Sequence, residues 1–161
     1  MSGSSPSALR QLIDTLVPPK EIRVVDVTGA EHVCPAAIPA RLQSRATAKL
    51  MEILDLPATS ASMKGLSGME TASPAEQIQA ILGVAKTLMG NEQVLDLVAE
   101  VVGIAFPAVI QAATTEAKAL GINVKNAADL FEIDQLIGLL SPFIVRLLVG
   151  MRDQMAKLLP Q

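Results

Sequence analysis

The chain is poor in the residue types from which most catalytic and nucleic-acid-binding sites are built. Its 161 residues include one histidine, one cysteine, three phenylalanines and no tyrosine or tryptophan. A zinc site needs several His or Cys ligands, so no metal site is expected, and no glycine-rich phosphate loop is present. The formal net charge of −3 and the few aromatic residues argue against a nucleic-acid partner, which requires basic patches and stacking side chains.

Signals for disulfides, export and membrane insertion are also missing. The single Cys34 forms no disulfide within the chain and fits a reducing compartment. Residues 1–7 are polar or small, so no export signal is expected. The apolar stretches 101–113 and 136–150 are shorter than the roughly 20 residues that span a bilayer, and the second contains Arg146. We therefore expect a cytoplasmic protein, in the host cytoplasm if the chain is viral.

Aliphatic residues, by contrast, are abundant. Half of the chain is apolar and the mean hydropathy is +0.43. After residue 74 most apolar residues recur every three or four positions, which is the period of a helix. Aliphatic surface that a small core does not need is usually exposed at an interface. The composition therefore predicts a mainly α fold, a helical bundle with apolar surface available to a partner.

One β-hairpin is predicted near the N-terminus of this bundle. Residues 21–27 alternate and are rich in β-branched side chains, residues 28–31 form a turn, and residues 32–38 are extended. An isolated hairpin is marginally stable, so it must pack on a helix or pair with another chain's edge. The predicted helices cover residues 7–17, 40–55, 73–89, 91–106, 107–120, 127 to an interruption at 141–142, and from there to 159.

Residues 57–72 are predicted to divide the chain into two units. This segment is rich in Ala, Ser, Thr and Gly and lacks a long apolar period, which is typical of a flexible linker. Residues 1–56 would hold a short helix, the hairpin and an amphipathic helix. Residues 73–161 would form the helical bundle, which begins with a capping box at Ser73 and Glu76.

His32 and Cys34 are the strongest candidates for nucleophilic chemistry. They lie two residues apart on a predicted strand and therefore share a face. A thiol activated by an imidazole is one interpretation. Pro35 follows directly, however, and no glycine-rich turn presents the thiol. We interpret the two residues as a half-buried structural pair, and we expect no enzyme activity, catalytic residue, metal or cofactor.

Two predicted helices each carry a line of like charges at a spacing of four residues. The basic line is Arg41, Arg45 and Lys49, and the acidic line is Glu92, Asp96 and Glu100. Solvated helix faces are one interpretation, and complementary docking within the chain or between copies is the other. Exposed ion pairs contribute only about 0–1 kcal/mol each, so such charges would orient an interface without stabilising it much.

The C-terminal region is the strongest candidate for a partner surface. One apolar line is Ile133, Leu136, Leu140, Phe143, Leu147 and Met151, and a second is Ile137, Ile144, Leu148, Met155 and Leu158. A helix that is apolar on two sides lies in a core or shares one side with a partner, and both interpretations stay open. The predicted partner-binding residues are Leu136, Leu140, Phe143, Leu147, Met151 and Met155.

Two stretches carry a resemblance to a known family. Residues 20–54, KEIRVVDVTGAEHVCPAAIPARLQSRATAKLMEIL, resemble the start of many tail assembly chaperones of tailed bacteriophages. Those proteins have a short hairpin, a small-residue and proline step, and a basic amphipathic helix ahead of a helical body. Residues 126–148, NAADLFEIDQLIGLLSPFIVRLL, are similar to their later helices. The resemblance implies a non-enzymatic protein that binds tape measure and tail tube components during assembly.

The sequence therefore predicts an assembly or interaction protein that buries apolar helical segments of a protein partner, or of a second copy in an oligomer. A membrane-surface-associated helical protein and a structural virion component are the alternatives. The lack of tryptophan and of a Lys/Arg-rich polar face on the late helices argues against the membrane surface.

Overall fold

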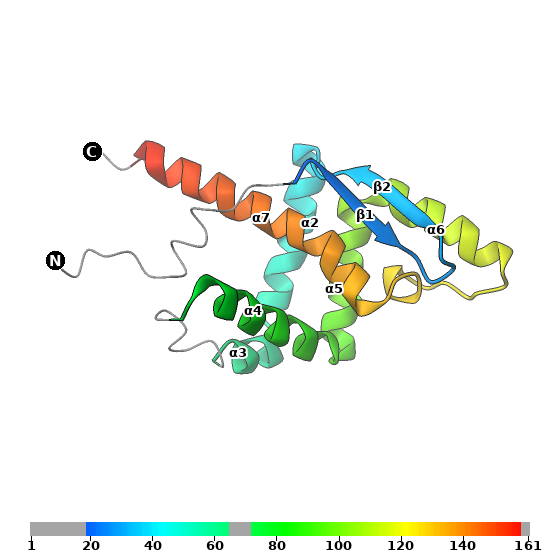
Figure 1. Ribbon diagram of the computed structural model, residues 1–161, viewed down its shortest axis with the longest axis horizontal. Helices are drawn as coiled ribbons and strands as arrows, with labels where there is room; N and C mark the ends of the chain where they lie inside the picture. The colour runs from blue at the N-terminus through cyan, green and yellow to red at the C-terminus, as the bar shows by residue number, and fades with distance from the viewer. Residues whose placement is uncertain (1–18, 65–71, 159–161) are drawn as a thin grey trace.

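The computed structural model describes residues 19–64 and 72–158, and the helix predicted at residues 7–17 lies outside them. Within these residues the fold is mainly α with one N-terminal β-hairpin, which confirms the predicted fold class. The elements in chain order are β1 (Glu21–Val25), β2 (Glu31–Pro35), α2 (Ala40–Leu54), α3 (Pro57–Met63), α4 (Pro74–Met89), α5 (Glu92–Ala105), α6 (Pro107–Ala119), the 3-10 helix η3 (Ala127–Asp129) and α7 (Ile133–Leu158) (Figure 1).

The hairpin forms as the alternation predicted, although both strands are shorter. β1 and β2 pair antiparallel, with Ile22 opposite Cys34 and Val24 opposite His32. Ile22 and Val24 are buried, while their neighbours along β1 face solvent. The strand ends before Asp26 because the chain turns there, and the Asp26 carboxylate accepts hydrogen bonds from backbone N–H groups inside the turn.

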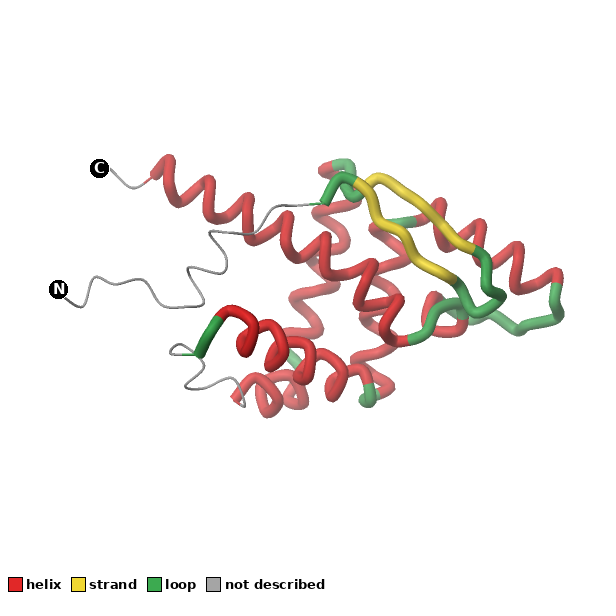
Figure 2. The backbone as a smooth tube through the Cα atoms, in the orientation of Figure 1, coloured by secondary structure: helices red, strands yellow, loops and turns green. Residues whose placement is uncertain are grey.

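Helices cover the hairpin, which is the first of the two arrangements predicted for it. β1 packs along α7 and β2 packs on α6, so the hairpin lies against these two helices (Figure 2). The N–H of Val25 donates to Oε1 of Gln135 at 2.8 Å, and the N–H of Val27 donates to the carbonyl of Leu130 at 2.8 Å. These two bonds use donors at the end of β1 that would otherwise be free to pair with another strand.

One hydrophobic core contains residues from both sides of the predicted linker. α2 packs extensively on α5, and the two helices run in opposite directions (Figure 1). Ala46 of α2, Val98 and Val102 of α5, and Leu136 of α7 are all buried in this core, together with Ile22 of β1. The hairpin and α2 are thus packed against the helical bundle.

Part of the predicted linker is helical, so the prediction of an irregular segment was wrong for residues 57–63. Pro57 follows the end of α2 and occupies the first turn of α3, where its missing N–H costs nothing. The buried Thr59 hydroxyl donates to the carbonyl of Ile53 at 2.6 Å. Small residues let α3 approach α4 and α2 closely. Residues 65–71 of the predicted linker lie outside the described residues.

The last helix was predicted with the wrong start and a break that does not occur. Asn126 and Asp129 form a capping box around the single 3-10 turn η3, and α7 begins only at Ile133. Pro142 lies inside α7, which continues for 26 residues. Proline removes one helical hydrogen bond at a cost of about 3 kcal/mol. The buried side chains of Leu139 and Phe143 on either side of it offset that cost.

Because α7 is continuous, its length can be compared with that of a membrane-spanning helix. Its 18-residue window Ile133–Gly150 is long and apolar enough to cross a bilayer by length and composition, which the sequence, divided at Pro142, did not predict. α5 and α6 pass the same test only as a pair bent by 110°. The fold buries 17% of this window, including Leu136, Leu139 and Phe143 of the core.

Candidate functional site

α7 does not present the predicted partner-binding residues as one exposed face. Leu136 and Phe143 are 0% and 1% exposed, so these two belong to the core. Leu139, which neither apolar line included, is also fully buried. Every residue from Leu136 to Leu140 except Gly138 is a large aliphatic, so spacing alone could not identify the buried side. The contacts of α7 with β1 and α5 determine which of these residues are buried.

The other four predicted residues give a mixed result. Leu140 and Leu147 are partly buried and pack against the core. The side chains of Met151 and Met155 lie outside the described residues. Of the predicted residues whose side chains are described, Leu140 and Leu147 at the edge of the core therefore remain candidates for partner binding.

A more exposed apolar surface lies on α2, α3 and α4. Among the described residues these elements carry five of the ten large apolar side chains with the greatest exposure, between 41% and 51%: Met51, Leu54, Met63, Ile78 and Ile81. We call these five residues the α2–α4 surface. α3 packs against both α2 and α4, which makes the three elements neighbours. Met51 and Leu54 share one face of α2, and Ile78 and Ile81 share one face of α4, because each pair is three residues apart.

The two charged lines meet at a single pair. Nζ of Lys49 lies 3.0 Å from a carboxylate oxygen of Glu100 and 3.0 Å from one of Glu52. These hydrogen bonds, with Glu100 the stronger, raise the pKa of Lys49. α2 and α5 are antiparallel, so the basic and acidic lines extend in opposite directions from Lys49 and Glu100. Arg45 and Ile104 border the same hollow.

No other member of either line forms an ion pair with a described residue. Asp96 instead accepts a hydrogen bond from Nδ2 of Asn126 at 3.2 Å, which fixes the capping turn of η3 to α5. Within the described residues, the basic and acidic lines therefore form an ion pair with each other at Lys49 and Glu100. Arg41, Arg45 and Glu92 are exposed.

His32 is paired with an aspartate rather than with the cysteine beside it. Its Nε2 lies 2.6 Å from Oδ2 of the buried Asp26, and its ring meets Phe131 edge-on with the centroids 6.2 Å apart. Cys34 is partly buried on the same face, and burial raises the pKa of its thiol. A thiol in this setting is a weak nucleophile. Within the described residues, no three His, Cys, Asp or Glu side chains are grouped to hold a metal ion.

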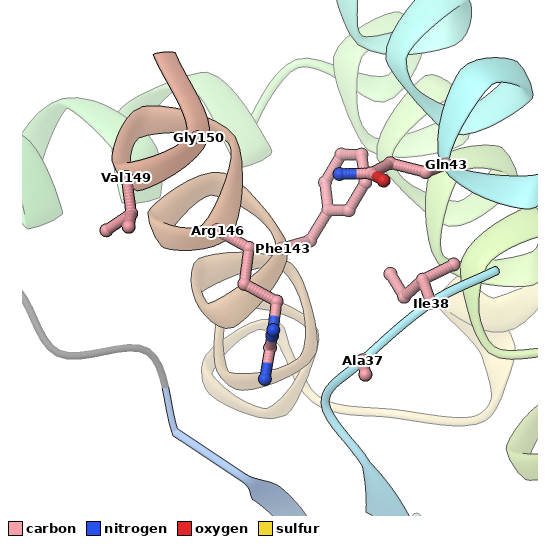
Figure 3. A pocket seen from close by; sticks show the side chains of 7 residues that line it. All are labelled: Ala37, Ile38, Gln43, Phe143, Arg146, Val149 and Gly150. Atoms are coloured by element: carbon pink, nitrogen blue, oxygen red, sulfur yellow. The ribbon is translucent and has the colours of Figure 1, made fainter. Parts of the chain in front are cut away.

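A pocket of about 250 Å³ opens between α7, the start of α2 and the segment that joins β2 to α2 (Figure 3). Its lining is Ala37, Ile38, Gln43, Phe143, Arg146, Val149 and Gly150. Nη2 of Arg146 donates to the carbonyl of Pro19 at 3.1 Å, whereas its buried Nε has no hydrogen-bond partner. Sequence reasoning missed this site, because it treated Arg146 only as an obstacle to a membrane span and gave no role to Gln43.

No protein-family model, curated protein or solved structure matches this chain. Its function is therefore argued from its residues and their geometry.

Proposed function

We propose that this protein is a non-enzymatic assembly or interaction protein that binds an apolar helical segment of a protein partner through the α2–α4 surface. The observation that carries the proposal is the exposure of Met51, Leu54, Met63, Ile78 and Ile81 on three adjacent elements. The three elements are neighbours, and large apolar side chains exposed near one another usually mark an interface.

The energy available from this surface favours transient binding. Fully burying one large aliphatic side chain contributes about 1.5–3 kcal/mol, and these side chains are already about half-buried. Covering all five would contribute roughly 3–7 kcal/mol, which is comparable with the roughly 4–15 kcal/mol that association costs. Such a surface holds a partner only with help from further contacts. Met51 and Met63 have unbranched side chains that adapt to partners of different shape.

A tail assembly chaperone of a tailed bacteriophage is the specific form of this function that we propose. The support is the resemblance of residues 20–54 and 126–148 to that family, together with an apolar surface suited to helical segments. The partner would then be a tape measure protein. A tape measure gene beside the gene for this chain is the expected finding, and a neighbourhood without phage structural genes would argue against this form.

The binding surface is tested with an apolar client that aggregates on its own. Reduced insulin B chain is such a probe, and light scattering follows its aggregation. We expect the full chain to delay aggregation, and the double variant Ile78→Asp/Ile81→Asp to lose most of the delay. Leu120→Asp is the matched control, because Leu120 is 66% exposed but lies at the end of α6. Circular dichroism checks that both variants keep their helix content.

The outcomes separate the proposal from its alternatives. Equal loss in the Leu120 variant, or no delay by the unmodified chain, would contradict binding through the α2–α4 surface. Pelleting of the chain with anionic liposomes would support the membrane-surface alternative instead. Multi-angle light scattering measures self-association, and a change of mass in the double variant alone would identify a second copy as the partner.

A further inference from the structure

The guanidinium of Arg146 carries a charge that nothing in the described part of the chain neutralises. None of the ion pairs among these residues includes Arg146. Its one hydrogen bond there is made by Nη2 to the carbonyl of Pro19, and the buried Nε has no acceptor. An arginine has five N–H donors, and here the one on Nε is buried without an acceptor.

The surroundings of Arg146 make this arrangement costly without a ligand. Phe143 is 1% exposed and forms part of the pocket wall, and Ile38 and Val149 add further apolar surface. Arg146 is partly buried beside these walls, and a buried donor with no acceptor, here Nε, costs about 1–3 kcal/mol. Buried unsatisfied groups of this kind are uncommon in native proteins.

The pocket also offers a second polar group. Figure 3 shows Gln43 entering from α2, with Phe143 and Arg146 on α7 and Ala37 and Ile38 on the joining segment. Small-molecule sites typically combine apolar walls with a few polar groups that set orientation. A carboxylate matches a guanidinium better than other common anions in an apolar setting, because its two oxygens fit the planar N–H donors.

We propose that this pocket binds a carboxylate carried on a short aliphatic group. The Arg146 guanidinium pairs with the carboxylate, and the aliphatic group lies against Phe143 and Ile38, on the side of the pocket where Gln43 enters. A pocket of about 250 Å³ is smaller than the roughly 300–1,000 Å³ of sites for drug-sized ligands, so the ligand is small. This site is separate from the α2–α4 surface, and the proposal does not depend on the proposed function.

Two kinds of ligand carry a carboxylate on a short aliphatic group. One is a short fatty acid, and the other is the C-terminal residue of a polypeptide. The experiment titrates the full ¹⁵N-labelled chain with hexanoate in one arm and N-acetyl-leucine in the other. Hexanamide and N-acetyl-leucine amide are the controls that keep shape and remove charge. We expect saturable shifts of the Gln43 side-chain NH₂ and Arg146 Nε–H signals with the acids, and dissociation constants at least about tenfold weaker with the amides. The tighter-binding acid identifies the source.

Matched variants assign the binding to the pocket. Arg146→Gln should weaken the acids at least about tenfold, whereas Arg45→Gln on the exposed side of α2 should leave their affinity unchanged. If Arg146→Gln fails to fold, Arg146→Lys takes its place, and it should also weaken the acids because an ammonium lacks the planar pair of N–H donors. The double variant Ile78→Asp/Ile81→Asp should bind the acids normally, which keeps this test apart from that of the proposed function.

Three results would overturn the proposal. They are the lack of a saturable shift with either acid, equal binding of the amides, and unchanged affinity in the pocket variants. The chain's own Asp14, four residues before Pro18, provides one further check. If the acids bind only in the variant Asp14→Asn, the guanidinium is satisfied within the chain and the pocket has no external ligand.

Discussion

Nε2 of His32 on β2 lies 2.6 Å from Oδ2 of Asp26, the residue that opens the hairpin turn. The other carboxylate oxygen accepts from the N–H and the hydroxyl of Thr28 and from the N–H of Ala30. One buried side chain therefore closes the turn and ties it to the second strand. The hairpin is therefore held by this aspartate as well as by the cross-strand pairing of its short strands.

Replacing Asp26 with asparagine should destabilise the protein in a pH-dependent way. Burial alone would raise the pKa of Asp26, but the hydrogen bonds from His32, Thr28 and Ala30 lower it below its ordinary value. A lowered pKa stabilises the fold above the ordinary aspartate range, and this contribution is lost as the pH falls through the lowered pKa. We expect Asp26→Asn to cost about 1–3 kcal/mol near neutral pH and clearly less near pH 3. Urea unfolding at both pH values measures the difference, and an equal cost at both would contradict this role.

Two leucines that are neighbours in α7 should respond differently to truncation. Leu139 is fully buried, whereas Leu140 is only partly buried at the edge of the core. Leu139→Ala should lower the free energy of unfolding by about 2–5 kcal/mol, because it leaves a cavity. Leu140→Ala should cost less than Leu139→Ala. Chemical denaturation of both variants compares them, and a larger cost at Leu140 would mean that the helix is rotated from the position described.

Lys49 should contribute little to stability, and its contribution should depend on salt. It is a partly exposed cation between Glu100 and Glu52, and dissolved ions screen its attraction to both. Lys49→Gln is expected to lower the melting temperature slightly at low salt and not at high salt. Arg45→Gln, one helical turn away, should show no salt-dependent change. A large effect of Lys49→Gln in high salt would indicate a packing role for its side chain.

Cys34 should react slowly with alkylating agents while the protein is folded. Burial raises the pKa of its thiol, so the reactive thiolate is scarce near neutral pH. We expect iodoacetamide to modify it several-fold more slowly in the native protein than in urea, as followed by mass spectrometry. Cys34→Ser should retain the helix content. Rapid alkylation of the native protein would identify an activated thiol and reopen the question of catalysis.

Separate polypeptides of residues 1–64 and 65–161 should associate when they are expressed together. The first carries Ile22, Val24 and Ala46, which are buried against residues of the second, including Val98 and Leu136. An affinity tag on one polypeptide should therefore recover the other. The core substitution Leu136→Asp should abolish the recovery. If the second polypeptide alone were monomeric, soluble and fully helical, this result would support the two-unit organisation predicted from the sequence.

Local signals in the sequence predicted much of the fold correctly. The Ser73 hydroxyl accepts from the N–H of Glu76 at the start of α4, and Asn91 caps α5 through the N–H groups of Gln93 and Val94. Gly121, with φ of 78°, follows α6 where a helix end was predicted. Each of these features depends on neighbours within a few residues, which a sequence displays directly.

The errors occur where distant contacts decide the outcome. Pro142 was expected to break a helix, but buried leucine and phenylalanine side chains keep α7 continuous. Residues 57–63 lack an apolar period, yet Thr59 finds an acceptor on α2 and forms part of a packed turn. The pocket at Arg146 joins residues of α2, α7 and the segment between β2 and α2, and no spacing in the sequence brings these together.

The attachment of β1 to α7 has a consequence for the order in which the chain folds during synthesis. Val25 bonds to a residue 110 positions later, and Arg146 bonds to a carbonyl 127 positions earlier. Contacts of such long range form late and slow the folding of a domain. On the ribosome, β1 emerges long before the helix that covers it, so its apolar face remains open to chaperones and to misassociation until α7 has been translated.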